Sequence, residues 1–111
     1  MKNFQTTLAC AFITSALFAF DANAVDADAA KALAKQSNCL RCHGIDKKKV
    51  GPAFNEIAAK YKGVPTAEDK LIKHLGSGEI AKFPDGHEEA HMILKADPAE
   101  TKNLVDWILS L

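Results

Sequence analysis

The residues with the most obvious chemistry are two cysteines and a histidine, Cys39, Cys42 and His43, in the order Cys-x-x-Cys-His. This pentad is typical of the attachment site of a c-type haem. Each thiol can bond one vinyl carbon of the porphyrin, and the histidine that follows can bind the iron as its proximal ligand. The pentad therefore predicts one covalently bound haem c, attached through Cys39 and Cys42, with His43 on the iron.

Two other uses of a Cys-x-x-Cys pair fit the rest of the chain less well. A redox disulfide of this kind is expected next to a βαβ unit, and the sequence contains no convincing strand. A zinc site needs further cysteine or histidine ligands. The third cysteine, Cys10, lies in a segment that we expect to be removed. An exported thiol or zinc protein is therefore the weaker alternative.

The first 24 residues have the pattern of a secretory signal peptide. A short basic start at Lys2 precedes an apolar run over residues 8–20, and Ala22 to Ala24 gives the small-x-small pattern of a cleavage site. The apolar run is too short to cross a bilayer as an ordinary helix. We predict that residues 1–24 are cleaved and that residues 25–111 form one exported domain. Because haem of this kind is attached outside the bacterial inner membrane, both patterns indicate the periplasm.

The exported part of the chain is patterned for short helices. The whole chain is 48% hydrophobic and 25% charged with a formal net charge of zero, a globular balance that gives no indication of nucleic-acid binding. Charge order, alanine content and apolar spacing predict helices at residues 26–36, 53–62, 67–75, 88–95 and 97–111, without a sheet. A domain this short buries a modest share of its surface, so we expect the haem to form the middle of the core.

The first and last of these helices carry the clearest signals. Asp97, Pro98 and Glu100 have the order of an N-cap, a first-turn proline and a capping-box partner. Ala30 and Ala34 share a face and would allow a close helix crossing. In the last helix, we expect four apolar residues at helical spacing to face inward: Leu104, Trp107, Ile108 and Leu111.

The helix at residues 67–75 carries weaker signals. We expect Thr66 to be its N-cap. His74, among polar neighbours, is predicted to be a surface residue.

Residues 25–111 resemble the small bacterial class I cytochromes c, which carry one haem. The resemblance rests on the pentad, on Gly51-Pro52, on the alanine-rich first helix and on the ending of the last helix at residues 107–109. It implies an all-α cytochrome c fold of four to five short helices around one covalent haem. It also implies that the Pro52 carbonyl accepts a hydrogen bond from His43, which would fix the orientation and basicity of that ligand. Phe83 is expected to pack against the haem.

The distal ligand of the iron is the point where the chain departs from that family. Relatives carry a Met-Pro pair on the distal loop, whereas this chain has His91 followed by Met92. Met92 is the only methionine after the predicted cleavage site, and a thioether is the usual family ligand, so Met92 is the first choice. Counting back from Trp107, however, places the family's methionine nearer His91. A His91 ligand would give a lower potential, and His87 is a third option.

The sequence thus predicts a periplasmic one-electron carrier that is not an enzyme. We expect it to be a monomer whose partners are redox proteins such as a reductase, an oxidase or a membrane cytochrome complex, with no nucleic acid and no stable membrane insertion. Lys47 to Lys49 could form a solvated loop or attract an acidic redox partner. The alternative function is a haem-based binder or sensor of small ligands, which would require a displaceable distal ligand.

Overall fold

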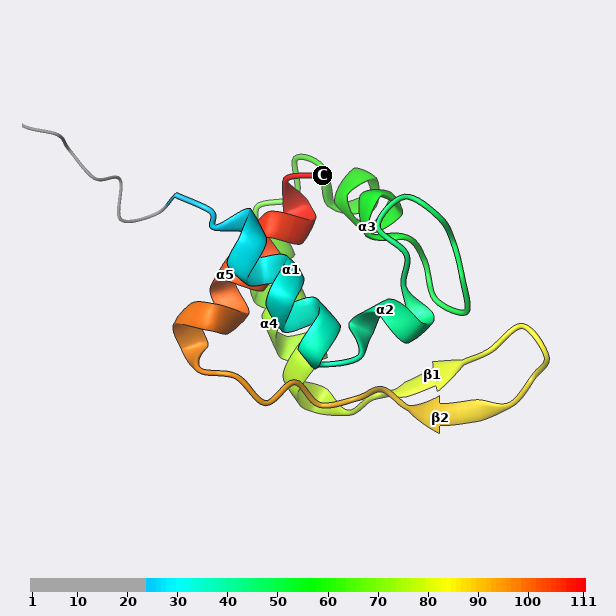
Figure 1. Cartoon of the computed structure of the whole chain (residues 1–111). Helices are drawn as coiled ribbons and strands as arrows, with labels where there is room; N and C mark the ends of the chain where they lie inside the picture. Colours follow the sequence, from blue (N-terminus) through cyan, green and yellow to red (C-terminus); the bar gives the residue numbers. More distant parts are fainter. Residues whose placement is uncertain (1–23) are drawn as a thin grey trace, which may run out of the picture.

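The computed structural model describes residues 24–111, so the predicted signal peptide lies outside the described residues except for Ala24. The elements follow one another as α1 (Ala27–Gln36), α2 (Cys39–Cys42), α3 (Phe54–Tyr61), α4 (Ala67–Ser77), β1 (Ile80–Lys82), β2 (Glu88–Ala90) and α5 (Pro98–Leu109). Figure 1 shows the two strands as a hairpin that extends away from the helices. The fold is mostly helical, as predicted, with five helices in the described part of the chain.

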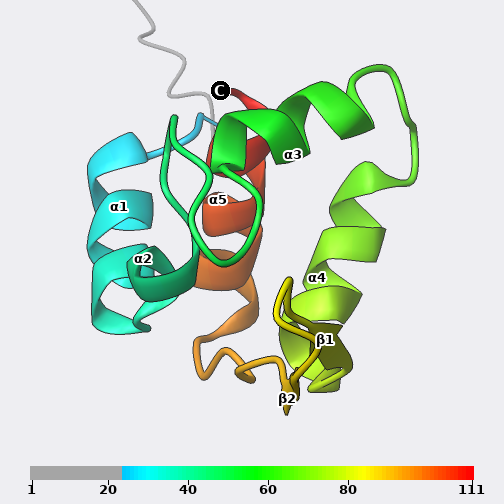
Figure 2. The same cartoon turned by 90° about the vertical axis from the view of Figure 1, so that its right-hand side faces the viewer.

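Helix α5 lies in the middle of the helical unit. Figure 2 shows it between α1 and α4, with α3 across one end, and all three helices pack against it. Ala30 and Ala34 of α1 are 1% and 0% exposed, which confirms the predicted small face. The crossing is also fixed by two reciprocal hydrogen bonds. The Asp26 amide donates to Asn103 Oδ1, and Asn103 Nδ2 donates to the Asp26 carbonyl, each at 2.8 Å.

The core forms around the aromatic residues of α3 and α5. Phe54 and Trp107 are each 3% exposed and meet edge to face, with ring centres 5.8 Å apart. The prediction that Trp107 belongs to the core is therefore confirmed. Leu111 was predicted to face inward, but it is 43% exposed because α5 ends at Leu109 and the helical spacing stops there. Val105, which the sequence did not single out, is 0% exposed.

The helix ends follow their local signals in two cases out of three. The Asp97 side chain accepts from the Glu100 amide at 2.8 Å and Glu100 caps the Asp97 amide in return, so the predicted capping box is present. Asp26 caps α1 in the same way. Thr66 precedes α4 but makes no capping hydrogen bond through its side chain. That prediction was wrong.

The segment between α4 and α5 differs from the prediction. Residues 88–95 were expected to form a short helix, and no sheet was expected, but β1 and β2 pair as an antiparallel hairpin with Ile80 opposite Ala90. The turn explains the difference. Gly86 has a φ of +90°, which glycine adopts without strain, and its amide donates to the Phe83 carbonyl at 2.9 Å. The turn residues thus return the chain on itself before a helix can begin.

None of the helices in residues 24–111 combines the length and the apolar character that crossing a membrane requires.

Candidate haem site

The two cysteines lie on one turn of helix. Asn38 has a left-handed backbone with a φ of +56°, and α2 then runs from Cys39 to Cys42 and is closed by a hydrogen bond from the His43 amide to the Cys39 carbonyl at 2.9 Å. Side chains three residues apart in a helix share a face, so both thiols can reach one edge of a planar ligand. Both thiols are free and partly buried, and burial raises the pKa of Cys39. Redox-active cysteines have lowered pKa values, so the raised pKa of Cys39 does not fit a reactive thiol of that kind.

His43 follows directly and is held by the next loop. Its Nδ1–H donates to the Pro52 carbonyl at 2.7 Å. Because a carbonyl oxygen can only accept, this bond keeps the proton on Nδ1 and leaves the Nε2 lone pair available for a metal. Phe54 stacks against the same ring, with centres 5.5 Å apart and planes 20° from parallel. The hydrogen bond that the family resemblance implied is present, and His43 is oriented from two sides.

Gly51 lets the loop approach His43 closely. The Gly51 amide donates to the Cys42 carbonyl at 2.7 Å, which draws the loop back onto the pentad. A Cβ atom at this position would lie 2.6 Å from Cε1 of His43 and 2.9 Å from Nδ1. Real Cβ contacts are not this short, so a side chain here would have to displace the imidazole or the loop.

The substitution Gly51→Ala is therefore expected to destabilise the protein by about 1–3 kcal/mol, the usual range for overpacking. The thermal midpoint of the haem-loaded protein measures this loss, and the Soret spectrum should change with it. Gly76 of α4 provides a matched control, because a Cβ there would have no atom within 4 Å. Gly76→Ala should leave stability unchanged or raise it slightly. Equal midpoints for the two variants would contradict the close contact.

His91 lies on the other side of the site. Its ring centre is 6.2 Å from that of His43, with the planes 51° apart. Its Nδ1–H donates to the Met92 carbonyl at 3.0 Å, so its Nε2 lone pair is also available. Burial lowers the pKa of His91, and the nearby His74 adds to that effect. The imidazole is therefore in its neutral, metal-binding form at neutral pH.

This arrangement passes a simple test of fit. A metal–nitrogen bond of about 2 Å on each side places the centres of two imidazoles on one metal ion roughly 6 Å apart. The separation of His43 and His91 matches that spacing. In both rings, the Nδ1–H also donates a hydrogen bond to a backbone carbonyl. The residues present therefore fit a haem, which Cys39 and Cys42 would hold covalently and for whose iron His43 and His91 would supply nitrogen ligands.

The other predicted site residues lie elsewhere. Met92, the first choice for the distal ligand, is 52% exposed. His87, the third option, pairs with Asp85 in the hairpin and stacks on Phe83 with ring centres 4.1 Å apart. Phe83 is therefore packed against a histidine of its own turn. The structure brings the His91 ring close to that of His43, while Phe83 and His87 stack on each other in the hairpin.

His74 is a site residue that the sequence did not reveal. Its side chain is 37% exposed, in line with the predicted surface position, and its ring centre also lies 4.2 Å from that of His91. Its Nδ1 pairs with Glu79 Oε1, and this hydrogen bond is the main cause that lowers the pKa of Glu79. No local pattern could have shown the contact, because His74 is on α4 and His91 follows the hairpin.

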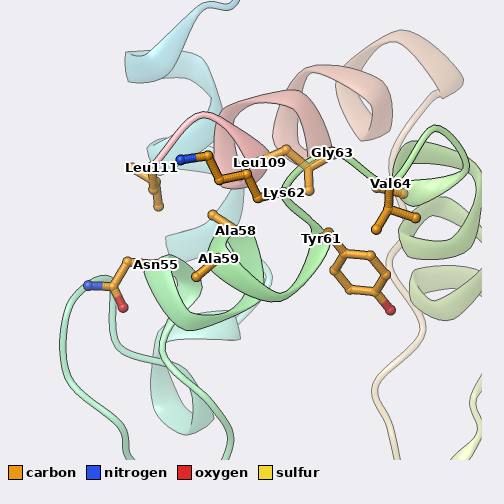
Figure 3. A pocket seen from close by; sticks show the side chains of 10 residues that line it. Asn55, Ala58, Ala59, Tyr61, Lys62, Gly63, Val64, Leu109 and Leu111 are labelled. Carbon is orange, nitrogen blue, oxygen red and sulfur yellow. The ribbon is translucent and has the colours of Figure 1, made fainter.

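A separate hollow is formed by α3, the segment after it and the C-terminal residues (Figure 3). Its lining consists of Asn55, Ala58, Ala59, Tyr61, Lys62, Gly63, Val64, Ala67, Leu109 and Leu111. None of the predicted haem residues belongs to it. The hollow is therefore not the site formed by the pentad and His91.

Comparisons with known proteins agree with this geometry. A family model described as cytochrome c matches residues 27–111. Cytochrome c-552 of Hydrogenobacter thermophilus is 42% identical over 82 residues, covering 71% of this chain and 78% of that protein. Cytochrome c-551 of Allochromatium vinosum is 36% identical over 85 residues, covering 71% of this chain and 82% of that protein.

The chain is also similar to solved structures of cytochromes. The crystal structure of class 1 cytochrome MtoD from Sideroxydans lithotrophicus ES-1 is 61% identical in sequence with a TM-score of 0.77, and it covers 78% of this chain and 97% of that chain. Cytochrome c552 of Nitrosomonas europaea is 34% identical with a TM-score of 0.58, covering 72% of this chain and 96% of that chain.

Proposed function

Since this chain belongs to the class I monohaem cytochrome c family, we propose that it carries single electrons between larger redox proteins in the periplasm. Membership implies a covalent haem c, for which Cys39 and Cys42 are the Cys-x-x-Cys pair. Proteins of this family are electron carriers and not enzymes. The periplasm is supported by the signal-peptide pattern of residues 1–24.

The proposal assigns His43 as the proximal ligand and His91 as the distal ligand, in place of Met92. The observation that carries the assignment is the pair of neighbouring imidazoles, whose ring centres are 6.2 Å apart and which each donate through Nδ1–H to a backbone carbonyl. Met92 is more than half exposed, whereas His91 is partly buried. A second imidazole in place of a thioether favours the ferric state and lowers the potential.

The bound haem supplies an iron that changes oxidation state by one electron. The chain's own residues then have two tasks. Phe54 and the Pro52 carbonyl hold His43 in one orientation, so the ligand need not rearrange when the charge changes. The backbone of Met92 holds His91 in the same way. A fixed ligand set on both faces suits electron transfer better than substrate binding.

Partner docking is proposed for the loop beside the pentad. Lys47 and Lys48 are exposed, and so are Ile45 and Val50 at 37% and 44%. Lys49 is different, because its Nζ donates to the Leu40 carbonyl at 2.7 Å and ties the loop to α2. Clustered positive charge raises the encounter rate with an acidic redox partner. The loop therefore offers two free cations and two apolar side chains next to the haem attachment site.

Optical spectroscopy of the purified protein tests both the function and the ligands. We expect a low-spin ferric spectrum without the weak far-red band of methionine-ligated iron. We also expect the reduced protein to bind carbon monoxide only slowly, because a bound distal ligand must first leave, while it still exchanges electrons with a soluble redox mediator. A far-red methionine band would refute the assignment of His91. Ready carbon monoxide binding would instead favour the alternative function, a haem-based binder of small ligands.

A further inference from the structure

We propose that His74, anchored by Glu79, is a positioning residue that holds His91 at the distal face of the haem. The inference rests on the proposed function, because it takes His91 as the distal ligand. It concerns a residue that makes no bond to the iron itself. Three contacts at the end of α4 support this role.

The first contact is between the two rings. The ring centres of His74 and His91 are 4.2 Å apart and their planes are inclined by 52°. His43 lies on the other side of His91, with its ring centre 6.2 Å away. The His91 ring therefore lies near both His43 and His74, and the ring of His74 is the nearer of the two. A ring in van der Waals contact limits the rotation of its neighbour.

The second contact anchors His74. Its Nδ1 pairs with Glu79 Oε1, although the side chains of His74 and Glu79 are 37% and 58% exposed. Without this partner, an imidazole at the edge of a helix would be free to turn toward water. The Ser77 hydroxyl completes the corner, since it donates to the His74 carbonyl at 3.0 Å and accepts from the Glu79 amide at 3.3 Å.

The third contact joins the backbones. The His91 amide donates to the Glu79 carbonyl and the Leu94 amide donates to the Leu75 carbonyl, both at 2.8 Å. These bonds fix the segment of His91 against the end of α4. They leave the imidazole free to rotate about its own side-chain bonds, with only the Met92 carbonyl holding Nδ1. The contact with His74 limits this remaining freedom.

The experiment compares the haem-loaded protein with three variants of the corner. His74→Ala removes the ring, His74→Phe keeps a ring without the bond to Glu79, and Glu79→Ala removes the anchor. Lys70→Ala, an exposed residue of the same helix, is the matched control. The readouts are the paramagnetic resonance spectrum of the ferric protein and the rate at which the reduced protein takes up carbon monoxide.

We expect His74→Ala to take up carbon monoxide roughly tenfold faster than the unmodified protein, the lower end of the loss usual when a partner of a metal ligand is removed. A second low-spin species should appear in its resonance spectrum. Glu79→Ala should likewise take up carbon monoxide faster and show a second low-spin species. His74→Phe should restore the unmodified behaviour, because a phenyl ring keeps the packing against His91 and, unlike an imidazole, has no polar atom that would draw it toward water when the bond to Glu79 is lost. The control should change neither readout.

The outcomes separate this proposal from the one it rests on. If His74→Ala and Glu79→Ala both match the unmodified protein while that protein lacks a methionine band, the positioning role is refuted and the His91 ligand stands. If the unmodified protein shows the methionine band, both fail together. If His74→Phe behaves as His74→Ala does, ring packing is not the cause and the proposal is overturned.

Discussion

A chain in which Cys39 and Cys42 are both replaced by serine is expected to contain no covalent haem and to lose most of its ordered structure. The reason lies in the core. Among the described residues, Leu104 and Val105 are the largest side chains that are fully buried. A domain of this length buries a limited share of its surface, so removing its cofactor should remove a large part of the stability.

Mass spectrometry of the exported protein and its helical circular dichroism measure these two losses. The variant should lack the added mass of one haem and should lose most of its helical signal. Cys10→Ser is the matched control, since Cys10 lies in the predicted signal peptide. That control should retain haem, fold and processing. A double variant that keeps the added mass would overturn the attachment site, and a Cys10→Ser protein without haem would contradict the predicted cleavage.

The second large effect is expected at the distal ligand. His91→Met should introduce the far-red band of thioether ligation and raise the midpoint potential by on the order of 0.1 V, within the roughly 0.8 V range that axial ligands cover. The direction follows because a thioether favours the ferrous state more than an imidazole does. Voltammetry of the purified protein gives the shift, and the ferric spectrum gives the ligand.

Met92→Leu is the matched variant for this experiment. It changes the neighbouring residue, which is 52% exposed, and should leave both the potential and the spectrum as they are. The opposite outcome would assign the ligand to Met92. A large change in Met92→Leu together with an unchanged His91→Ala protein would make Met92 the ligand, as the usual pattern of the family suggested. The two single substitutions therefore decide between the residues without a structure of either variant.

The sequence predicted those parts of the protein that depend on neighbours along the chain. The Asp97 and Glu100 capping box is such a feature, because all of its atoms lie within one helical turn. The pentad is another. The crossing of α1 and α5 was predictable from Ala30 and Ala34 because a close approach requires small side chains. Local chemistry and residue size are visible in a sequence without any structure.

The distal side was harder to predict because its contacts join distant segments. His74 and His91 are separated by the hairpin, and only the turn residues Pro84 to Gly86 indicated that the chain reverses there. Phe83 was expected at the haem, but it stacks on His87 of the same turn. The choice between His91 and Met92 is a difference of one position, which a loop of unknown path cannot resolve. Only the three-dimensional course of residues 79–95 brings His91 toward His43.

The position of α5 has a consequence for how the protein is made. Helices α1, α3 and α4 all pack on this helix, and the bonds between Asp26 and Asn103 join residues 77 positions apart. Of the described helices, α5 comes last along the chain, and it is the one on which the others assemble. Contacts this distant form late, since the intervening chain must first be ordered. We therefore expect α1, α3 and α4 to pack stably only after α5 has been synthesised.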